Sequence, residues 1–359
     1  MEINTKAPKQ WIHSSYHRQQ WKITKARTLE TTYSNAMNKN IKKEGDTQRT
    51  ALTFGELAEM WLQTKENIVK HSTYLAYIFC LKHHLLPRYG EAVEIEEEDA
   101  QQYITEHLAK GVAKKTIRDH IATLRAVLRF GERRGLYAHR EWRLEYPRDR
   151  KNNRVRVLSL AHHRKLSAYL EENLSCTTAP ILIALYTGMR VGEVCGLRWE
   201  DIDLQRRVLH VSRTRSYVWN VITKKCETYE DTPKTKNSDR EIPISNSLYS
   251  ALCRLRKQRA PELFPYVVGS TNKGTNNRNI NETLRRILLN LKLPLITFHG
   301  LRHTFATRLV ESKCDIKTVS TILGHSTVAT TLNLYVHPDT DQKRKALAKL
   351  NRLIGSDNP

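Results

Sequence analysis

The sequence predicts a mainly helical chain with a small antiparallel β-sheet, an α+β fold divided into two domains. Apolar residues recur at three- and four-residue steps in several segments, which is the period of a helix packed on one face. Two short runs, 208–211 and 240–244, have the composition of strands joined by a long, lysine-rich hairpin. Between the two regions, 146–154 loses periodicity and gains charge, which indicates a linker. A length of 359 residues agrees with two or three domains.

The composition indicates a polyanionic partner. The chain carries 60 Lys and Arg against 37 Asp and Glu, a formal net charge of +23 at pH 7, and such an excess would repel itself in a fold that binds no anion. Nucleic acid is the first expectation. An anionic membrane is the weaker one, because there is no signal peptide, lipidation motif or membrane-length apolar run. Six scattered cysteines without a CxxC pair fit reduced thiols in a cytoplasmic protein.

The distribution of charged and apolar residues divides the chain into five segments. The first is basic and poor in aliphatic residues, so we expect a partly disordered arm that tracks a DNA backbone rather than an independent domain. The segments are 1–49 for this N-terminal arm, 50–147 for a helical DNA-binding domain, 148–157 for a basic linker, 158–341 for a mixed domain and 342–359 for a short C-terminal helix.

Helix signals follow one another through the first of the two domains. Thr53 and Glu56 have the spacing of a capping box and begin the first helix. Further helices are expected from about Ser72 to a stop at Pro87 and Gly90, over 98–109, and from about 117 to Gly131 or Gly135.

The last of these helices has an exposed face on which nearly all charges are positive. Its basic residues are Lys114, Lys115, Arg118, Arg125 and Arg129. A charged face is usually only a solvated face, yet the single sign of charge favours contact with DNA phosphates.

In the second domain, helices are expected over 160–170, 180–186 and 281–291. The pair Thr187-Gly188 should end the second of these just before Arg190. A later glycine, Gly324, should end another helix as its C-terminal cap.

The stretch 297–337 combines four side chains suited to phosphoryl transfer. His299 and Arg302 lie three residues apart at the start of a helical pattern, His325 follows a glycine, and Tyr335 comes ten residues later. An arginine presents a planar fork of donors to phosphate oxygens, and a histidine donates to or accepts from the same phosphate near neutral pH. A tyrosine hydroxyl can attack phosphorus.

Two further motifs, TGMRVGEVCGLRWEDID at 187–203 and PKTKNSDREIPI at 233–244, complete an ordered set of Arg, Lys, His-x-x-Arg, Gly-His and Tyr. Together with 297–337 they closely resemble the catalytic domain of the tyrosine recombinases, or phage integrase family, and 52–136 looks like that family's helical, SAM-like core-binding domain. The resemblance implies a site-specific recombinase of a phage or other mobile element. Such an enzyme cleaves DNA through a 3′-phosphotyrosine, releases a 5′ hydroxyl and rejoins strands without a metal or other cofactor.

The resemblance assigns roles to single residues. Arg190 and Arg302 match the two arginines that clamp the scissile phosphate. His299 and His325 match the family's histidines, and Tyr335 matches its nucleophile.

Two assignments in the same set keep alternatives. Glu193 matches an acidic position that supports the site, but its spacing also fits a simple surface partner of Arg190. The lysine that protonates the leaving 5′ oxygen is Lys234 or Lys236, and Lys234 is preferred.

Other classes of function fit the sequence less well. His299 and His303 have the spacing of a zinc pair, but Gly300 stands where a zinc protease has glutamate and no third ligand is evident, so no metal site is expected. A non-catalytic DNA-binding regulator has no need of a tyrosine framed by arginines. A type IB topoisomerase would share the chemistry but relax supercoils without exchanging strands. Within the recombinases, a Xer-like chromosome or plasmid resolvase is the alternative to an integrase.

The expected partner is double-stranded DNA that carries recombination sites. The resemblance implies a homotetramer on DNA in which C-terminal helices are exchanged, and an accessory DNA-bending or excision factor is a further candidate. The apolar stripe of that helix, Ala346, Leu347, Leu350 and Leu353, must be buried against something; packing on its own domain is the alternative. The expected location is the cytoplasm, in association with the nucleoid.

Overall fold

The computed structural model describes residues 52–138, 141–148, 156–220, 223–231, 239–258, 265–269, 274–325 and 327–335, with a few isolated residues between 344 and 351. Its contacts divide the chain into two compact units. One runs to Val69 and from Tyr77 to Tyr146, and the other holds Lys70–Ala76 and the residues from Pro147. The expected arm over 1–49, most of the linker, both candidate lysines and most of the C-terminal helix lie outside the described residues.

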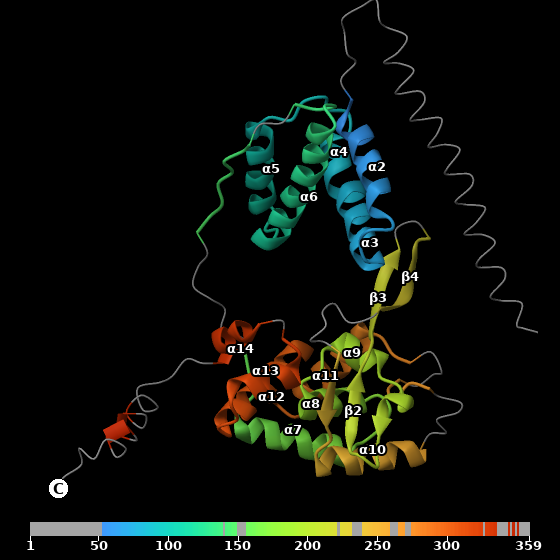
Figure 1. Cartoon of the computed structure of the whole chain (residues 1–359), viewed down its shortest axis with the longest axis vertical. Helices are drawn as coiled ribbons and strands as arrows, with labels where there is room; N and C mark the ends of the chain where they lie inside the picture. Colours follow the sequence, from blue (N-terminus) through green and yellow to red (C-terminus); the bar gives the residue numbers. More distant parts are fainter. Residues whose placement is uncertain are drawn as a thin grey trace, which may run out of the picture. The chain divides into compact units, whose positions relative to one another are not determined.

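The first unit is built from helices (Figure 1). In chain order these are α2 (Phe54–Lys65), α3 (His71–Cys80), of which the residues up to Ala76 are grouped with the other unit, the π-helical η1 (Leu81–Leu85), α4 (Leu86–Tyr89), α5 (Glu97–Ala109) and α6 (Lys114–Arg133). The capping box expected at the start of α2 is confirmed: the Thr53 hydroxyl accepts from the Glu56 N–H at 3.3 Å, and the Glu56 carboxylate accepts from the Thr53 N–H at 2.9 Å. Leu57, Trp61, Leu124 and Leu128 belong to its buried core.

The expectation that Pro87 ends a helix was wrong. The chain stays helical through Pro87, and α4 ends at Gly90. Pro87 lies in the first turn of α4, where a proline's missing N–H leaves no hydrogen bond unmade. The π-helical turn directly before it already breaks the regular hydrogen-bond ladder, so the ring is accommodated.

The second unit combines helices with two small sheets. Its helices are α7 (Leu160–Glu172), α8 (Ala179–Thr187), α9 (Val191–Gly196), the 3₁₀ turn η2 (Trp199–Asp201), α10 (Asn246–Gln258), α11 (Asn277–Asn290), α12 (Phe298–Glu311), α13 (Ile316–Leu323) and α14 (Val328–Tyr335). The strands β1 (Ile202–Asp203), β2 (Val208–Val211) and β5 (Arg240–Pro243) form an antiparallel sheet in the order β1-β2-β5. The pairing expected between 208–211 and the strand that begins at Arg240 is therefore confirmed.

The sequence did not reveal several elements of this unit. The connection between β2 and β5 contains a second antiparallel pair, β3 (Thr214–Asn220) and β4 (Lys225–Asp231), and α10 and β1 were also missed. Most residues of β4 are exposed or half-buried on both faces, so its sequence lacks the apolar alternation by which strands are recognised.

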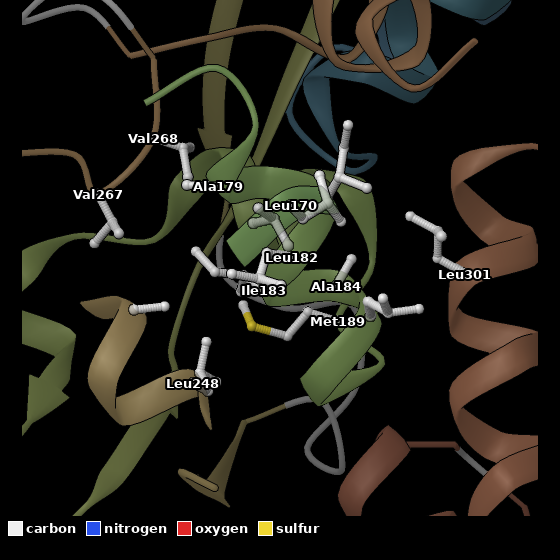
Figure 2. Close-up of a cluster of buried hydrophobic side chains, with 14 of the residues drawn as sticks. Leu170, Ala179, Leu182, Ile183, Ala184, Met189, Leu248, Val267, Val268 and Leu301 are labelled. Carbon is white, nitrogen blue, oxygen red and sulfur yellow. The ribbon is translucent and has the colours of Figure 1, made fainter. Parts of the chain in front are cut away.

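Helix α8 forms the centre of the second unit. It contacts α7, α9, α10, α11 and α12, and every residue in it except Tyr186 is buried. Figure 2 shows Leu182 and Ile183 from this helix among the buried side chains around Met189. A helix surrounded in this way must be apolar on all sides. Because the helix is packed on all sides, its C-terminal end fixes the position of the residues that follow it.

Two observations complete the fold. All six cysteines are free thiols. Within the described ranges, no helix has both the length and the apolar character that crossing a bilayer requires.

Candidate active site

The end of α8 places the first candidate arginine. Gly188 caps the helix with φ +66°, a backbone conformation that favours glycine. Arg190 then stands at the N-cap position of α9. The helix break expected at Thr187-Gly188 is thus confirmed, and it turns Arg190 out of the apolar core.

The second candidate arginine and both histidines come from the neighbouring helices α12 and α13. The Thr297 hydroxyl caps α12 by accepting from the Gly300 N–H at 3.3 Å, so His299 lies in the first turn and Arg302 lies one turn later. His299 is exposed, whereas Arg302 is 1% exposed. The expected cap at Gly324 is confirmed, with φ +65°, and it turns the chain directly into His325.

Three guanidinium groups converge on the C-terminal end of α13. Arg240 Nε donates to the carbonyl of Ile322 at 2.6 Å, Arg302 Nη2 to that of Leu323 at 2.7 Å, and Arg190 Nη2 to that of Gly324 at 3.0 Å. The last carbonyls of a helix have no partner within the helix and carry the negative end of its dipole. They are therefore suited to hold cations in place without neutralising them, which leaves positive charge for a phosphate.

Glu193 is buried between two of these arginines. Its carboxylate accepts from Arg190 Nη1 at 2.7 Å, from the Arg190 N–H at 2.9 Å and from Arg240 Nη2 at 2.9 Å. Burial alone would raise the pKa of this carboxyl, but the hydrogen bond and charge of Arg240, and then the charge of Arg190, hold it below its usual range. At 4% exposed, Glu193 is not the surface partner considered as the alternative.

The candidate histidines are neutral while the site holds no anion. Burial, followed by the charges of Arg302 and Arg190, lowers the pKa of His325 to about 4. The ring of His299 is partly desolvated although the residue as a whole is exposed, and this desolvation and the same two charges lower its pKa. A bound phosphate would offset the charge of the arginines and raise both pKa values, so each histidine can accept or donate a proton once DNA is in place.

His303 is a buried neighbour of this site. Its ring centre lies 4.5 Å from that of His299, at an interplanar angle of 89°, and burial and the neighbouring positive groups lower its pKa to about 4. Among the described residues, no group of three His, Cys, Asp or Glu side chains is arranged to hold a metal ion.

The candidate nucleophile is the last residue of α14. This helix packs against α12 and α13 and ends at Tyr335. His325 Nδ1 lies 2.8 Å from Oγ1 of the buried Thr331. Positions 331 and 335 share one face of the helix because they are four residues apart. The side chain of Tyr335 lies outside the described part of the structure, as do Lys234 and Lys236.

The candidate DNA-binding residues of α6 do not form a uniformly exposed face. Lys115 and Arg118 are exposed, whereas Lys114 and Arg125 are half-buried. Two of them also hold the segment that leaves this unit: Arg125 Nη2 donates to the Trp142 carbonyl at 2.8 Å, and the Arg118 guanidinium lies 4.9 Å from the ring centre of Tyr146. Their contact with phosphates stays a prediction.

Arg240 is the residue of this site that the sequence did not single out. A signal was present, because residues two apart on a strand share a face and Arg240 therefore lies on the same face as the apolar Ile242. Both are buried. A charged residue on the apolar face of a strand indicates a buried polar partner, which here is Glu193.

Gly188→Ala should disturb this site more than it disturbs the rest of the domain. A Cβ at this position would lie 2.5 Å from Phe305 Cδ1 and 2.8 Å from Leu323 Cδ2, and the positive φ strains any side chain. The Gly188 carbonyl also accepts from Arg302 Nη1 at 2.8 Å. We expect a lower melting temperature and slower DNA cleavage with DNA binding retained. Gly111→Ala, at φ +76° with open space around it, is the matched control and should spare cleavage.

The chain is similar to known recombinases and transposases. The chain is 29% identical over 332 residues to a tyrosine recombinase XerC-like protein of Caldanaerobacter subterraneus subsp. tengcongensis, with 84% of each chain covered. It is 28% identical over 214 residues to the transposase of transposon Tn916 from Enterococcus faecalis, which covers 55% of this chain and only 51% of the transposase.

Solved structures extend the likeness to the fold. The integrase of transposon Tn1549 in complex with transposon right end DNA superposes with a TM-score of 0.69 at 25% identity, over 83% of this chain and 99% of that one. A lambda integrase tetramer bound to a Holliday junction shares the fold at 16% identity and a TM-score of 0.60. The model of the phage integrase family matches residues 156–342, more than half of the 359 residues, and the chain therefore belongs to the phage integrase family.

Proposed function

We propose that this protein is the integrase of a mobile genetic element and that it inserts and excises that element at specific DNA sites. As a tyrosine recombinase it cleaves and religates DNA strands. The observation that carries the proposal is the convergence of Arg190 and Arg302 on the end of α13, beside His325. Two guanidiniums held in place by backbone carbonyls suit an anionic group with two free oxygens, such as a phosphodiester, and do not suit a metal ion.

The proposed reaction is an exchange of ester bonds at phosphorus. Arg190 and Arg302 neutralise the non-bridging oxygens and stabilise the charge that develops as phosphorus becomes five-coordinate. The Tyr335 oxygen forms a bond to phosphorus while the bond from phosphorus to the 5′ oxygen breaks, which leaves a 3′-phosphotyrosine and a 5′ hydroxyl. The tyrosine proton passes to a neutral acceptor, for which His299 and His325 are suited, because their lowered pKa values keep them unprotonated.

The leaving 5′ oxygen needs a proton, and we assign its donor to Lys234 rather than Lys236. Lys234→Ala should therefore slow cleavage more than Lys236→Ala. A substrate with sulfur at the 5′ bridging position needs no proton on its leaving group, so it should restore cleavage by Lys234→Ala on a denaturing gel. Restoration of Lys236→Ala instead would reverse the assignment.

Partners and domain roles belong to the same proposal. We propose that residues 50–147 and 158–341 each bind double-stranded DNA, with Lys114, Lys115, Arg118 and Arg125 on its phosphates, and that 1–49 is a further DNA-binding arm. Four copies would assemble on two sites by exchanging the helix over 342–359. The Tn1549 integrase, which binds transposon DNA, supports a DNA partner for this chain. Because the substrate is DNA, we place the protein at the nucleoid, and an accessory bending or excision factor would favour one direction of reaction.

Strand exchange between two DNA sites tests the function. Purified protein with two labelled fragments that carry the flanking sequences of its own coding element should produce recombinant joints. A supercoiled plasmid without such sites should stay supercoiled. Relaxation without joints would favour a type IB topoisomerase, and joints only between chromosomal resolution sites would favour a resolvase. DNA binding without joints or relaxation would favour a non-catalytic DNA-binding regulator.

A further inference from the structure

Arg240 occupies a position that links three parts of the site. It is the first residue of β5, it is 7% exposed, and it pairs with Val211 of β2. It follows the segment 232–238, which contains both candidate lysines, with one residue between. Its place on the sheet therefore sets where the end of that lysine-bearing segment is anchored.

The guanidinium of Arg240 points its donors in two directions. Nη2 donates to Glu193 Oε2 at 2.9 Å and Nη1 to Oε1 at 3.3 Å, while Nε donates to the Ile322 carbonyl at 2.6 Å. One rigid, planar group thus joins β5, α9 and α13. A lysine ammonium has the charge but not the fixed fork, so it cannot reproduce both contacts together.

Each partner of Arg240 also bears on an arginine that contacts the phosphate in the proposed reaction. Glu193 accepts from Arg190 Nη1 at 2.7 Å. The carbonyls after Ile322 accept from Arg302 and Arg190. Without Arg240, the Glu193 carboxylate and the end of α13 would each lose one of the groups that hold them beside Arg190 and Arg302.

We propose that Arg240 is a positioning residue for DNA cleavage, acting through Glu193 on Arg190 and through the end of α13 on His325. The proposal rests on the recombinase function proposed above. The competing explanation is a purely structural ion pair, since the loss of one partner of any buried pair destabilises a fold. The test must therefore include a quantity that stability alone does not change.

The pH dependence of cleavage supplies that quantity. Arg240 contributes most to holding the pKa of Glu193 below its usual range against the effect of burial. If its charge is removed, burial raises that pKa, and Glu193 takes up a proton at a higher pH than in the wild type. A protonated Glu193 no longer pairs with Arg190 as a carboxylate, so cleavage should begin to fall at a higher pH as the solution is acidified.

The experiment compares Arg240→Met and Arg240→Lys with Arg213→Met. Arg213 also pairs with a buried carboxylate, 2.8 Å from Asp201, from a partly exposed position, and it contacts none of the candidate catalytic residues in the described structure. Single-turnover cleavage of a suicide substrate, gel-shift binding and thermal melting are measured for each variant, with cleavage measured below every melting point and over a range of pH.

Both Arg240 variants should bind DNA like the wild type and cleave it about 100-fold more slowly, the scale of a small misplacement of reacting groups. The pH below which cleavage falls should be higher in Arg240→Met than in the wild type. It should stay near the wild-type value in Arg240→Lys, which keeps the charge. Arg213→Met should have a lower melting temperature than the wild type but the same cleavage rate and the same pH dependence of cleavage. The proposal would be overturned if Arg240→Lys cleaved DNA as fast as Arg213→Met. It would also be overturned if a folded Arg240→Met showed the same pH dependence of cleavage as the wild type. Absence of cleavage by the wild type would instead refute the proposed function.

Discussion

Tyr335→Phe should abolish covalent capture of DNA while DNA binding stays nearly unchanged. The substitution removes one hydroxyl oxygen, the atom that becomes bonded to phosphorus, but it removes no charge from an interface dominated by Lys and Arg. A suicide substrate nicked near the cleavage point should give a covalent band on a denaturing gel with the wild type and none with the variant.

Tyr217→Phe is the matched control for this loss. Tyr217 lies on β3 in the same unit and is 40% exposed, so its hydroxyl is equally removable but not part of the site. The control should form the covalent band at the wild-type rate. A persistent band in Tyr335→Phe, or its loss in Tyr217→Phe, would remove Tyr335 from the role of nucleophile.

Arg302→Lys and Arg190→Lys should each slow cleavage by about 10²–10³-fold, the usual effect of losing one donor to a transition-state oxygen. Each guanidinium uses part of its fork on backbone carbonyls and in the proposed reaction would present the rest to the phosphate, and a lysine cannot do both. Arg302 also donates to Gly188 and Leu323 while 1% exposed. We therefore expect Arg302→Lys to lower the melting temperature more than Arg190→Lys does.

Arg308→Lys separates the clamp from general effects on α12. Arg308 lies on the same helix, where it pairs with Glu311 at 2.7 Å and donates to the Leu158 carbonyl at 3.2 Å. Its lysine variant should bind and cleave like the wild type. Full cleavage by either Arg302→Lys or Arg190→Lys at saturating DNA would contradict a bidentate clamp.

Local signals in the sequence predicted much of the fold. The capping box at Thr53, the break at Gly188 and the cap at Gly324 depend on side chains or backbone angles within a few residues, and each is present in the structure. The stop expected at Pro87 failed because a π-helical turn precedes it and Pro87 lies in the first turn of the next helix, where a proline is tolerated. The strands β3 and β4 escaped notice because their faces lack apolar alternation.

The convergence of the arginines could not be derived from local pattern. Arg190 and the Gly324 carbonyl are 134 residues apart, and only the packing of α8 against α12 brings them together. The order of the motifs, through the family resemblance, indicated which residues are candidates for catalysis. It did not indicate which contacts position their side chains. Arg240 is the clearest case, because its partners come from α9 and α13 and its strand position alone suggested burial.

Identification of the residue that becomes linked to DNA tests the central claim most directly. The covalent complex formed on the suicide substrate would be digested with protease and nuclease, and the modified peptide sequenced by mass spectrometry. The account predicts one modified residue, Tyr335, joined through phosphate to the 3′ end of the cleaved strand. A modification on any other residue, or a linkage to the 5′ end, would contradict it.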